Sequence, residues 1–212
     1  MLSVYFAGEL FSSKHLLGNA ALADIIAKTS NLQFVCVLPQ TIENRGLGAH
    51  HVRDLDILTL LNCDLALFNF DGPELDSGTV VEFLFAKFAD IPALILRTDF
   101  RHGGDQTDDP WNLMASFYPR TKTVCINSME LYKGFLKQSL PPVQAGQKLL
   151  KHIAKVVLKE LELLRELPPI IPENLTEPVY RWLSHMPGFQ SPESAEKVMA
   201  ALTQKIAKRL LL

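Results

Sequence analysis

The sequence predicts an α/β fold in which a doubly wound, mostly parallel five-stranded sheet carries helices on both faces. Short apolar segments alternate along the chain with longer segments whose apolar residues recur at helical spacing. Such alternation is typical of βαβ units with right-handed crossovers. The segment 65–70 is apolar at almost every position, as expected of a strand buried on both faces of a parallel sheet.

Taken in chain order, each of the first strands leads to a helix. The helix after the first strand places Leu22, Ile25 and Ile26 on one face. A glycine-bearing loop at 40–51 precedes the second helix, and an Asp- and Gly-rich loop at 99–110 follows the fourth strand. The strands are expected at residues 2–7, 33–38, 65–70, 93–98 and 123–126, and the helices between them at 14–28, 52–62 and 78–89.

After Pro141-Pro142 the alternation ends. An amphipathic helix is expected there, then a proline-bearing connector that ends at Pro178, and then a last helix with Ser191 as N-cap and Pro192 at its first position. The expected boundaries are 1–140 for the α/β domain, 141–212 for a helical extension that packs on the domain or at a subunit interface, 147–167 for the amphipathic helix and 191–212 for the last helix.

Composition favours a soluble globular enzyme of the cytoplasm. The chain has 212 residues, of which 48% are hydrophobic, enough for a substantial core. Its net charge of -2 does not indicate a basic surface of the kind that binds nucleic acid. No apolar run is long enough to cross a membrane. No basic region precedes a long apolar segment at the N-terminus, so no signal peptide is expected. Cys36, Cys63 and Cys125 are interpreted as buried, reduced thiols, and no Cys or His pair has metal-ligand spacing.

Residues 71–82 form the most informative segment, because they place four carboxylates and a glycine turn between an apolar strand and a helix. Open α/β sheets bind ligands at such strand ends. Asp76 is a good N-cap residue and Glu82 lies about one turn into the helix, so the two can converge on one pocket. A cap and turn alone would explain Asp76 but not Glu82, since a carboxylate among apolar residues is costly unless it is paired or functional. Asp71 and Glu74 could be ligands of the pocket or solvated loop charges, and the second interpretation is favoured.

Four separated motifs within residues 2–135 carry a family resemblance. They are Tyr5-Phe6-Ala7-Gly8 with Leu10-Phe11, Asp56 eight residues ahead of Asp64, Asp76-Ser77-Gly78-Thr79 with Glu82, and Asn112-Leu113-Met114. In this order and spacing they resemble the nucleoside 2-deoxyribosyltransferase family. Its members have a Rossmann-like or flavodoxin-like sheet and move 2-deoxyribose between nucleobases.

The resemblance implies a role for each motif. Glu82 would attack C1′ of the sugar and form a covalent glycosyl-enzyme. Asp76 would protonate the leaving base, Asp56 would help to hold and protonate it, and Tyr5 would orient Glu82. The substrate-binding residues would be Gly8, Phe11, Gln40, Gly78, Asn112 and Met114, with Asn112 near the 5′-hydroxyl. The last two would close the pocket of a neighbouring subunit, which implies a homo-oligomer built from dimers, a tetramer or a hexamer. The resemblance implies no cofactor and no metal.

The chain departs from the family pattern at two positions. Glu9 stands where members commonly have Pro, which bears on the shape of the first loop and on substrate selection. Leu84 stands where they commonly have Gly, and Leu needs room that Gly does not.

Three alternatives remain open from the residues. A hydrolase of 2′-deoxynucleoside 5′-monophosphates uses the same fold and glutamate but needs a phosphate cradle near the first loop, where Ser12-Ser13-Lys14 is equally a helix start. A nucleotide-sensing module would not need three converging carboxylates. A Mg²⁺ site in the Asp cluster, as in receiver-like folds, is disfavoured by the Gly-Thr helix start and the lack of a matching downstream lysine.

Overall fold

The sheet of the computed structural model confirms the predicted fold class. The structure describes residues 1–42, 45–100 and 112–208. Within them, five strands lie in the order β2-β1-β3-β4-β5, and each neighbouring pair is parallel. This is the strand order of flavodoxin-like doubly wound sheets. The strands are β1 (Leu2–Gly8), β2 (Phe34–Val37), β3 (Leu65–Asn69), β4 (Ala93–Arg97) and β5 (Thr121–Cys125).

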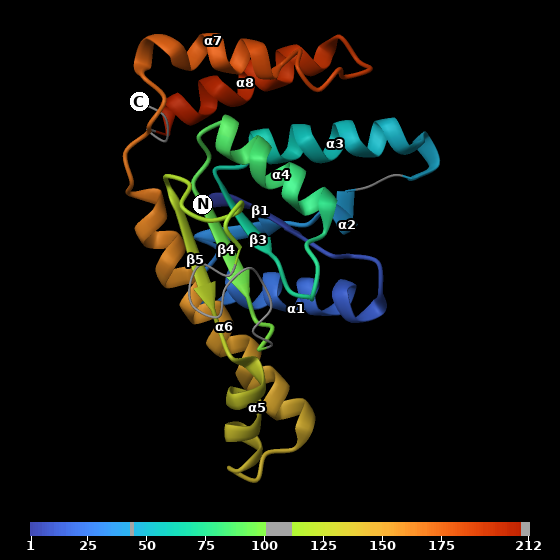
Figure 1. The fold of residues 1–212 in the computed structure, drawn as a ribbon, viewed down its shortest axis with the longest axis vertical. Helices are drawn as coiled ribbons and strands as arrows, with labels where there is room; N and C mark the ends of the chain where they lie inside the picture. The colour runs from blue at the N-terminus through green and yellow to red at the C-terminus, as the bar shows by residue number, and fades with distance from the viewer. Residues whose placement is uncertain (43–44, 101–111, 209–212) are drawn as a thin grey trace.

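Helices cover both faces of this sheet (Figure 1). On one face lie α1 (Ser13–Thr29) and α6 (Pro142–Arg165), and on the other lie α3 (Ala49–Asn62) and α4 (Ser77–Phe88). The pair α7 (Glu173–Leu183) and α8 (Glu193–Ala207) packs outside α3 and α4, so this side of the sheet has a second helical layer. The remaining helices are α5 (Ser128–Leu136), the short α2 (Pro39–Ile42) and a 3₁₀ turn, η1 (Arg45–Leu47).

The alternation of side chains along β1 decides which residues reach which face. Val4 and Phe6 belong to the core under α1 and α6, whereas Tyr5 and Ala7 belong to the core under α3 and α4. All four are buried. The period of two in β1 therefore delivers the Tyr5 ring to the face that carries α3 and α4.

Several element boundaries differ from the prediction. Helix α3 begins at Ala49, since Gly48 has a φ of 91° that suits glycine and ends the preceding turn. Helix α6 begins at Pro142, because proline is tolerated in the first turn of a helix. Helix α7 includes Pro178, which the prediction had assigned to a connector. The helix continues through Pro178 because one face of α7 is buried against the core.

Helix α5 was not predicted, although its start carries a signal. The Asn127 side chain accepts a hydrogen bond from Glu130 N at 3.0 Å, which is N-cap geometry. Cys63 is buried as predicted, but Cys125 is exposed because β5 is an edge strand with an exposed end. Most of the predicted loop at 99–110, and the last residues of the predicted final helix, lie outside the described residues. No helix in the described part of the chain is long and apolar enough to cross a membrane.

Candidate active site

A hydrogen bond between Tyr5 and Glu82 lies at the centre of the candidate site. The hydroxyl of Tyr5, the central residue of β1, donates to Glu82 Oε1 at 2.6 Å. Burial raises the pKa of Tyr5 well above its ordinary value, and the charges of Glu82 and Asp56 and the hydrogen bond to Glu82 raise it further. Tyr5 therefore stays protonated and acts as a donor, and the Glu82 carboxylate is held in one orientation.

Glu82 and Asp56 line the same cavity, which has a volume of about 770 Å³. Asp56 lies on α3 and Glu82 in the second turn of α4, so two neighbouring helices bring together two carboxylates that are distant in sequence. The remaining lining is largely apolar, and a cavity of this size suits a small organic molecule. It comprises Ala49, Val52, Arg53, Ile57, Ser77, Gly78, Val81, Phe85 and Pro187.

Asp76 is the N-cap of α4, as predicted, but it is not among the residues that line the cavity of Glu82, whereas the next two residues, Ser77 and Gly78, are. Its Oδ2 accepts hydrogen bonds from Thr79 N at 2.8 Å and from Thr79 Oγ1 at 2.7 Å. Oδ1 makes no hydrogen bond within the part of the chain that the structure describes. Gly78 lines the cavity, and a Cβ at this position would lie 3.3 Å from Asp76 Oδ2, so glycine leaves the cap undisturbed.

Gly8, Phe11 and Gln40 do not line the cavity that holds Glu82. Gly8 ends β1 beside Asn69, where an added Cβ would lie 3.2 Å from both Asn69 Cβ and Asn69 O. Phe11 is 72% exposed, and Gln40 Nε2 donates to Leu16 O at 2.9 Å. The close approach of two strands explains Gly8, and the predicted binding roles of all three residues stay predictions.

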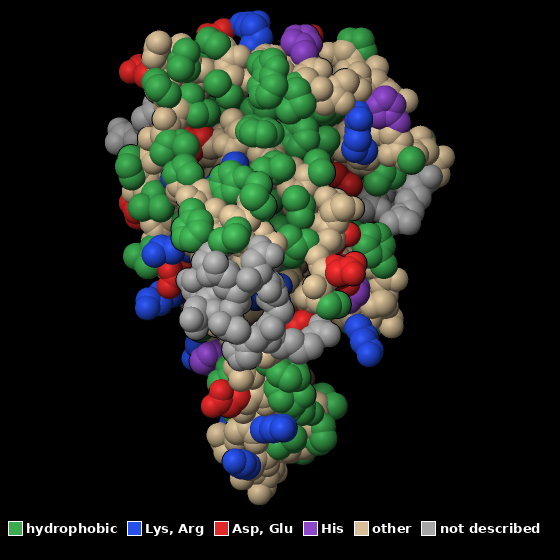
Figure 2. Space-filling view, in the orientation of Figure 1, with side chains coloured by type: hydrophobic (Ala, Val, Ile, Leu, Met, Phe, Trp, Pro, Cys, Tyr) green, Lys and Arg blue, Asp and Glu red, His purple; other side chains and the backbone are tan. Residues whose placement is uncertain are grey.

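Asn112 is half-buried and Met114 is exposed. Asn112 Oδ1 accepts hydrogen bonds from Met114 N at 3.0 Å and from Ala115 N at 2.9 Å, and these bonds close a tight turn. The turn presents Met114, which is 79% exposed, and Phe117, which is 80% exposed. Figure 2 shows hydrophobic side chains gathered on the face that carries α4, α7 and α8. Exposed apolar residues of these helices include Val81, Phe88, Leu175 and Trp182.

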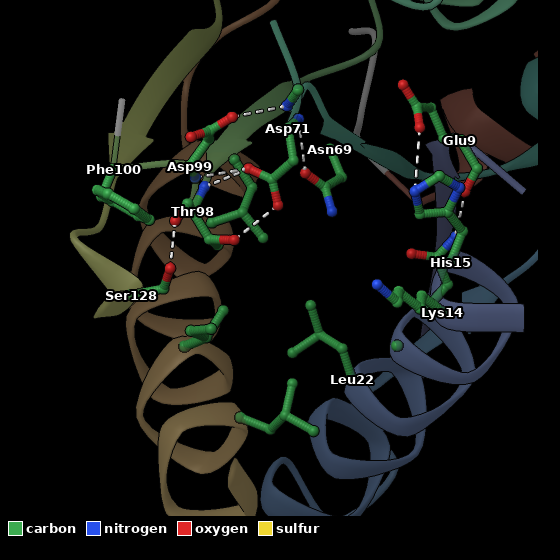
Figure 3. Close-up of a pocket in the computed structure, with 16 residues that line it drawn as sticks. Glu9, Lys14, His15, Leu22, Asn69, Asp71, Thr98, Asp99, Phe100 and Ser128 are labelled. Atoms are coloured by element: carbon green, nitrogen blue, oxygen red, sulfur yellow. Dashed lines mark hydrogen bonds and ion pairs between the residues drawn. The ribbon is translucent and has the colours of Figure 1, made fainter. Parts of the chain in front are cut away.

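A second cavity, of about 670 Å³, lies between α1 and α6 at the carboxyl ends of the strands. Figure 3 shows Lys14 pointing toward it from α1 and Asp71 and Thr98 from the strand ends. Asp71 accepts hydrogen bonds from Thr98 N, from Thr98 Oγ1 at 2.6 Å and from Asp99 N at 3.0 Å. The interpretation of Asp71 as a solvated charge is therefore wrong, because it joins the ends of β3 and β4. Glu74 is exposed.

Two residues of the first loop, Glu9 and Ser12, contact the start of α1. Glu9 Oε2 lies 3.0 Å from His15 Nε2, so the residue that stands where the family commonly has Pro pairs with the start of α1. The Ser12 side chain accepts a hydrogen bond from His15 N at 3.4 Å and is the N-cap of α1. Ser12 thus takes the helix-start role that the sequence had left open.

Sequence reasoning missed Arg53, Phe85 and Pro187, which also line the cavity of Glu82. Arg53 lies three residues before Asp56 and Phe85 three residues after Glu82, and this helical spacing is a signal that was available. Pro187 has no such signal, because the turn after α7 reaches the cavity only through tertiary packing. Among the described residues, no three His, Cys, Asp or Glu side chains gather as metal ligands.

The chain is similar to a protein family and to solved structures of other proteins. A family model described as nucleoside 2-deoxyribosyltransferase matches residues 4–114. A structure of a conserved protein from Enterococcus faecalis V583 is similar with a TM-score of 0.48 and 22% identity, over 77% of this chain and 98% of that one. A 2-deoxyribosyltransferase from Leishmania mexicana is similar with a TM-score of 0.43 and 22% identity, over 66% of this chain and 100% of that one. A search of curated proteins gave no match.

Proposed function

The chain belongs to the nucleoside 2-deoxyribosyltransferase family, and we propose that it moves 2-deoxyribose from a 2′-deoxynucleoside to a free nucleobase. The family match spans Tyr5, Asp56, Asp76 and Glu82. The observation that carries the proposal is the 2.6 Å hydrogen bond that orients Glu82 in a cavity shared with Asp56. A fixed carboxylate beside a second carboxylate, in largely apolar surroundings, suits covalent glycosyl transfer.

In the first step, a Glu82 carboxylate oxygen forms a bond to C1′ while the bond from C1′ to the base nitrogen breaks. The electron pair of that bond goes to the base, which takes a proton from a carboxylic acid. We assign this acid role to Asp76, with Asp56 holding and helping to protonate the base. The open Oδ1 of Asp76 and the place of Asp56 in the cavity support the assignment.

In the second step, a nitrogen of the incoming base attacks C1′ and the ester bond to Glu82 breaks. The incoming base returns its proton to a carboxylate, so the enzyme is regenerated. Water must be kept from C1′ between the two steps, and Val52, Val81 and Phe85 give the cavity an apolar lining that does so.

A product assay tests the reaction class directly. The protein is incubated with deoxyinosine plus adenine, and separately with thymidine plus adenine, and the products are separated by chromatography. Transfer gives deoxyadenosine, and comparison of the two donors shows whether pyrimidine nucleosides are accepted. Formation of free deoxyribose without deoxyadenosine would contradict the proposal and favour a hydrolase.

Hydrolysis of 5′-monophosphates is the second candidate, and the same assay with deoxyinosine 5′-monophosphate tests it. Lys14, the cation beside the first loop, lines the second cavity and not the cavity of Glu82. The cation that does line the cavity of Glu82, Arg53, is paired with Asp54, and together these placements favour transfer between unphosphorylated nucleosides.

Replacement of Tyr5 by phenylalanine is expected to lower kcat about 10- to 100-fold, because a hydrogen bond to a charged group contributes about 1.5–3 kcal/mol. The measurement is steady-state kinetics with deoxyinosine and adenine. Tyr180→Phe is the matched control, since the Tyr180 hydroxyl is also buried but donates to Ala89 O at 2.9 Å. Equal kcat values for Tyr5→Phe and the control would show that Tyr5 has no part in orienting Glu82.

A homo-oligomer in which Asn112 of one subunit completes the pocket of another is also proposed. The outward turn at Asn112 and the exposed Met114 support it. We expect co-expression of inactive Glu82→Ala chains with inactive Asn112→Ala chains to restore part of the activity, because a mixed interface contains one pocket with both native residues.

Differently tagged chains allow the hetero-oligomers to be isolated before the assay, and light scattering gives their mass. Each inactive chain, expressed and purified alone, sets the background activity. A monomer in solution, or verified hetero-oligomers with only background activity, would show that Asn112 does not act across an interface.

A further inference from the structure

The turn between α7 and α8, residues 184–190, is fixed to the start of α3. Gln190 N donates to Asp54 Oδ2 at 2.8 Å, and Arg53 Nη2 donates to Gly188 O at 3.1 Å. Arg53 also donates to Asp54 Oδ1, with Nε at 3.1 Å. Burial raises the pKa of Asp54, but the hydrogen bonds from Gln190 and Arg53 and the nearby charge of Arg53 outweigh it and hold this pKa below its ordinary value. Asp54 is therefore an ionised acceptor that anchors the turn.

The helices on either side of this turn are tied to the same two helices that carry the carboxylates. Tyr180 on α7 donates to Ala89 O at the end of α4 at 2.9 Å. Lys205 on α8 donates to Cys63 O at the end of α3, and Lys208 donates to Asp64 Oδ1 at 2.7 Å. These bonds fasten the two helices, whereas the bonds of Gln190 and Arg53 hold the turn itself, which lies beside the start of α3 in Figure 1.

The anchored turn places Pro187 in the lining of the cavity that holds Glu82. The proline ring is rigid, and its nitrogen has no hydrogen to donate. Together with Val81 and Phe85 it makes one side of the cavity apolar, while Asp56 supplies a polar group. A nucleobase has apolar faces and a polar edge, and these match such a cavity.

We infer that the turn at 184–190 forms the outer wall of the nucleobase site, with Pro187 against the base and Asp54 as the positioning residue that holds the wall. The inference rests on the proposed transfer reaction and adds a part of the chain beyond residues 4–114, where the family match ends. The wall has two effects. It strengthens base binding, and it keeps water from the glycosyl-enzyme, where water would bond to C1′, break the ester to Glu82 and leave its proton on a carboxylate.

The test compares Pro187→Gly and Asp54→Ala with the wild type, and Tyr180→Phe serves as the matched control. Tyr180→Phe removes a buried hydrogen bond from the same helical pair without touching the turn. Both wall variants are expected to raise the KM for adenine about tenfold, the effect of a lost apolar contact in a pocket. They should also raise the share of free deoxyribose among the products, while kcat at saturating adenine changes little.

The inference is overturned if folded wall variants keep the wild-type KM and product ratio, or if Tyr180→Phe changes both as much as they do. Pro187→Ala provides a milder variant should Pro187→Gly fail to fold. Calorimetric titration with adenine separates this inference from the proposed reaction because it requires no turnover. Weaker binding by Pro187→Gly supports the wall even if the wild type transfers no sugar. A wild type that transfers sugar while adenine binds Pro187→Gly equally well overturns the wall alone, and a wild type that binds no adenine overturns it as well.

Discussion

Replacement of Glu82 by alanine is expected to lower transfer by at least about 10³-fold, as removal of a nucleophile does in other covalent enzymes. Without the carboxylate no bond to C1′ forms, so the covalent route is lost. The fold should be retained, because Glu82 is only partly buried and its removal takes a charge out of apolar surroundings. Formation of deoxyadenosine from deoxyinosine and adenine measures the effect, and circular dichroism monitors the fold.

Two further variants make this result specific. Glu82→Gln keeps an oxygen that can accept the hydrogen bond from Tyr5 but is not a nucleophile, so it should be as inactive as Glu82→Ala. Glu74→Ala removes an exposed carboxylate from the same segment and should retain wild-type activity. Near-normal turnover by folded Glu82→Ala would refute the assignment of the nucleophile.

Asp56→Asn and Asp76→Asn are each expected to lower kcat by roughly 10²- to 10⁴-fold, the usual contribution of general acid catalysis. Asparagine is a good N-cap residue, and its oxygen can accept the bonds that Thr79 now donates to Asp76 Oδ2. Asp76→Asn therefore removes the acid and leaves the cap. Kinetics and thermal melting of each variant separate the two roles.

The opposite pattern would be equally informative. If Asp76→Asn melts at a lower temperature but has wild-type kcat, Asp76 is a structural cap and the acid lies elsewhere. Asp76→Ala should then behave the same way with a larger loss of stability, about 1 kcal/mol for a lost cap. The same comparison applies to Asp56, which lies within α3 and has no cap to lose.

Local pattern was sufficient to predict the fold and to single out Glu82. Alternating short and long apolar segments predicted the parallel sheet, because each βαβ unit is local in sequence. Glu82 was identified as an anomaly, a carboxylate among apolar residues. The inferences about the sheet and Glu82 need only the geometry of a single strand or helix. The role of Tyr5 came from the family resemblance, and the structure shows its hydroxyl bonded to Glu82.

The parts that were missed depend on contacts between distant segments. Asp71 was interpreted as a solvated charge because nothing nearby in the sequence shows that Thr98 and Asp99, which follow β4, lie beside it. Pro187 reaches the cavity only because Gln190 binds Asp54 on α3. Helix α5 is the exception, since its Asn127 cap could have been recognised from the sequence.

Mass spectrometry of a trapped intermediate tests the central claim most directly. A 2-fluoro-2-deoxyribosyl nucleoside gives an electron-poor sugar, which slows hydrolysis and transfer of the glycosyl-enzyme so that it accumulates. After incubation and proteolysis, the sugar mass should be found on the peptide that contains Glu82, and it should be absent from the Glu82→Gln protein. A sugar attached to another residue, or turnover of natural substrate by a protein that never carries the label, would contradict a covalent intermediate on Glu82.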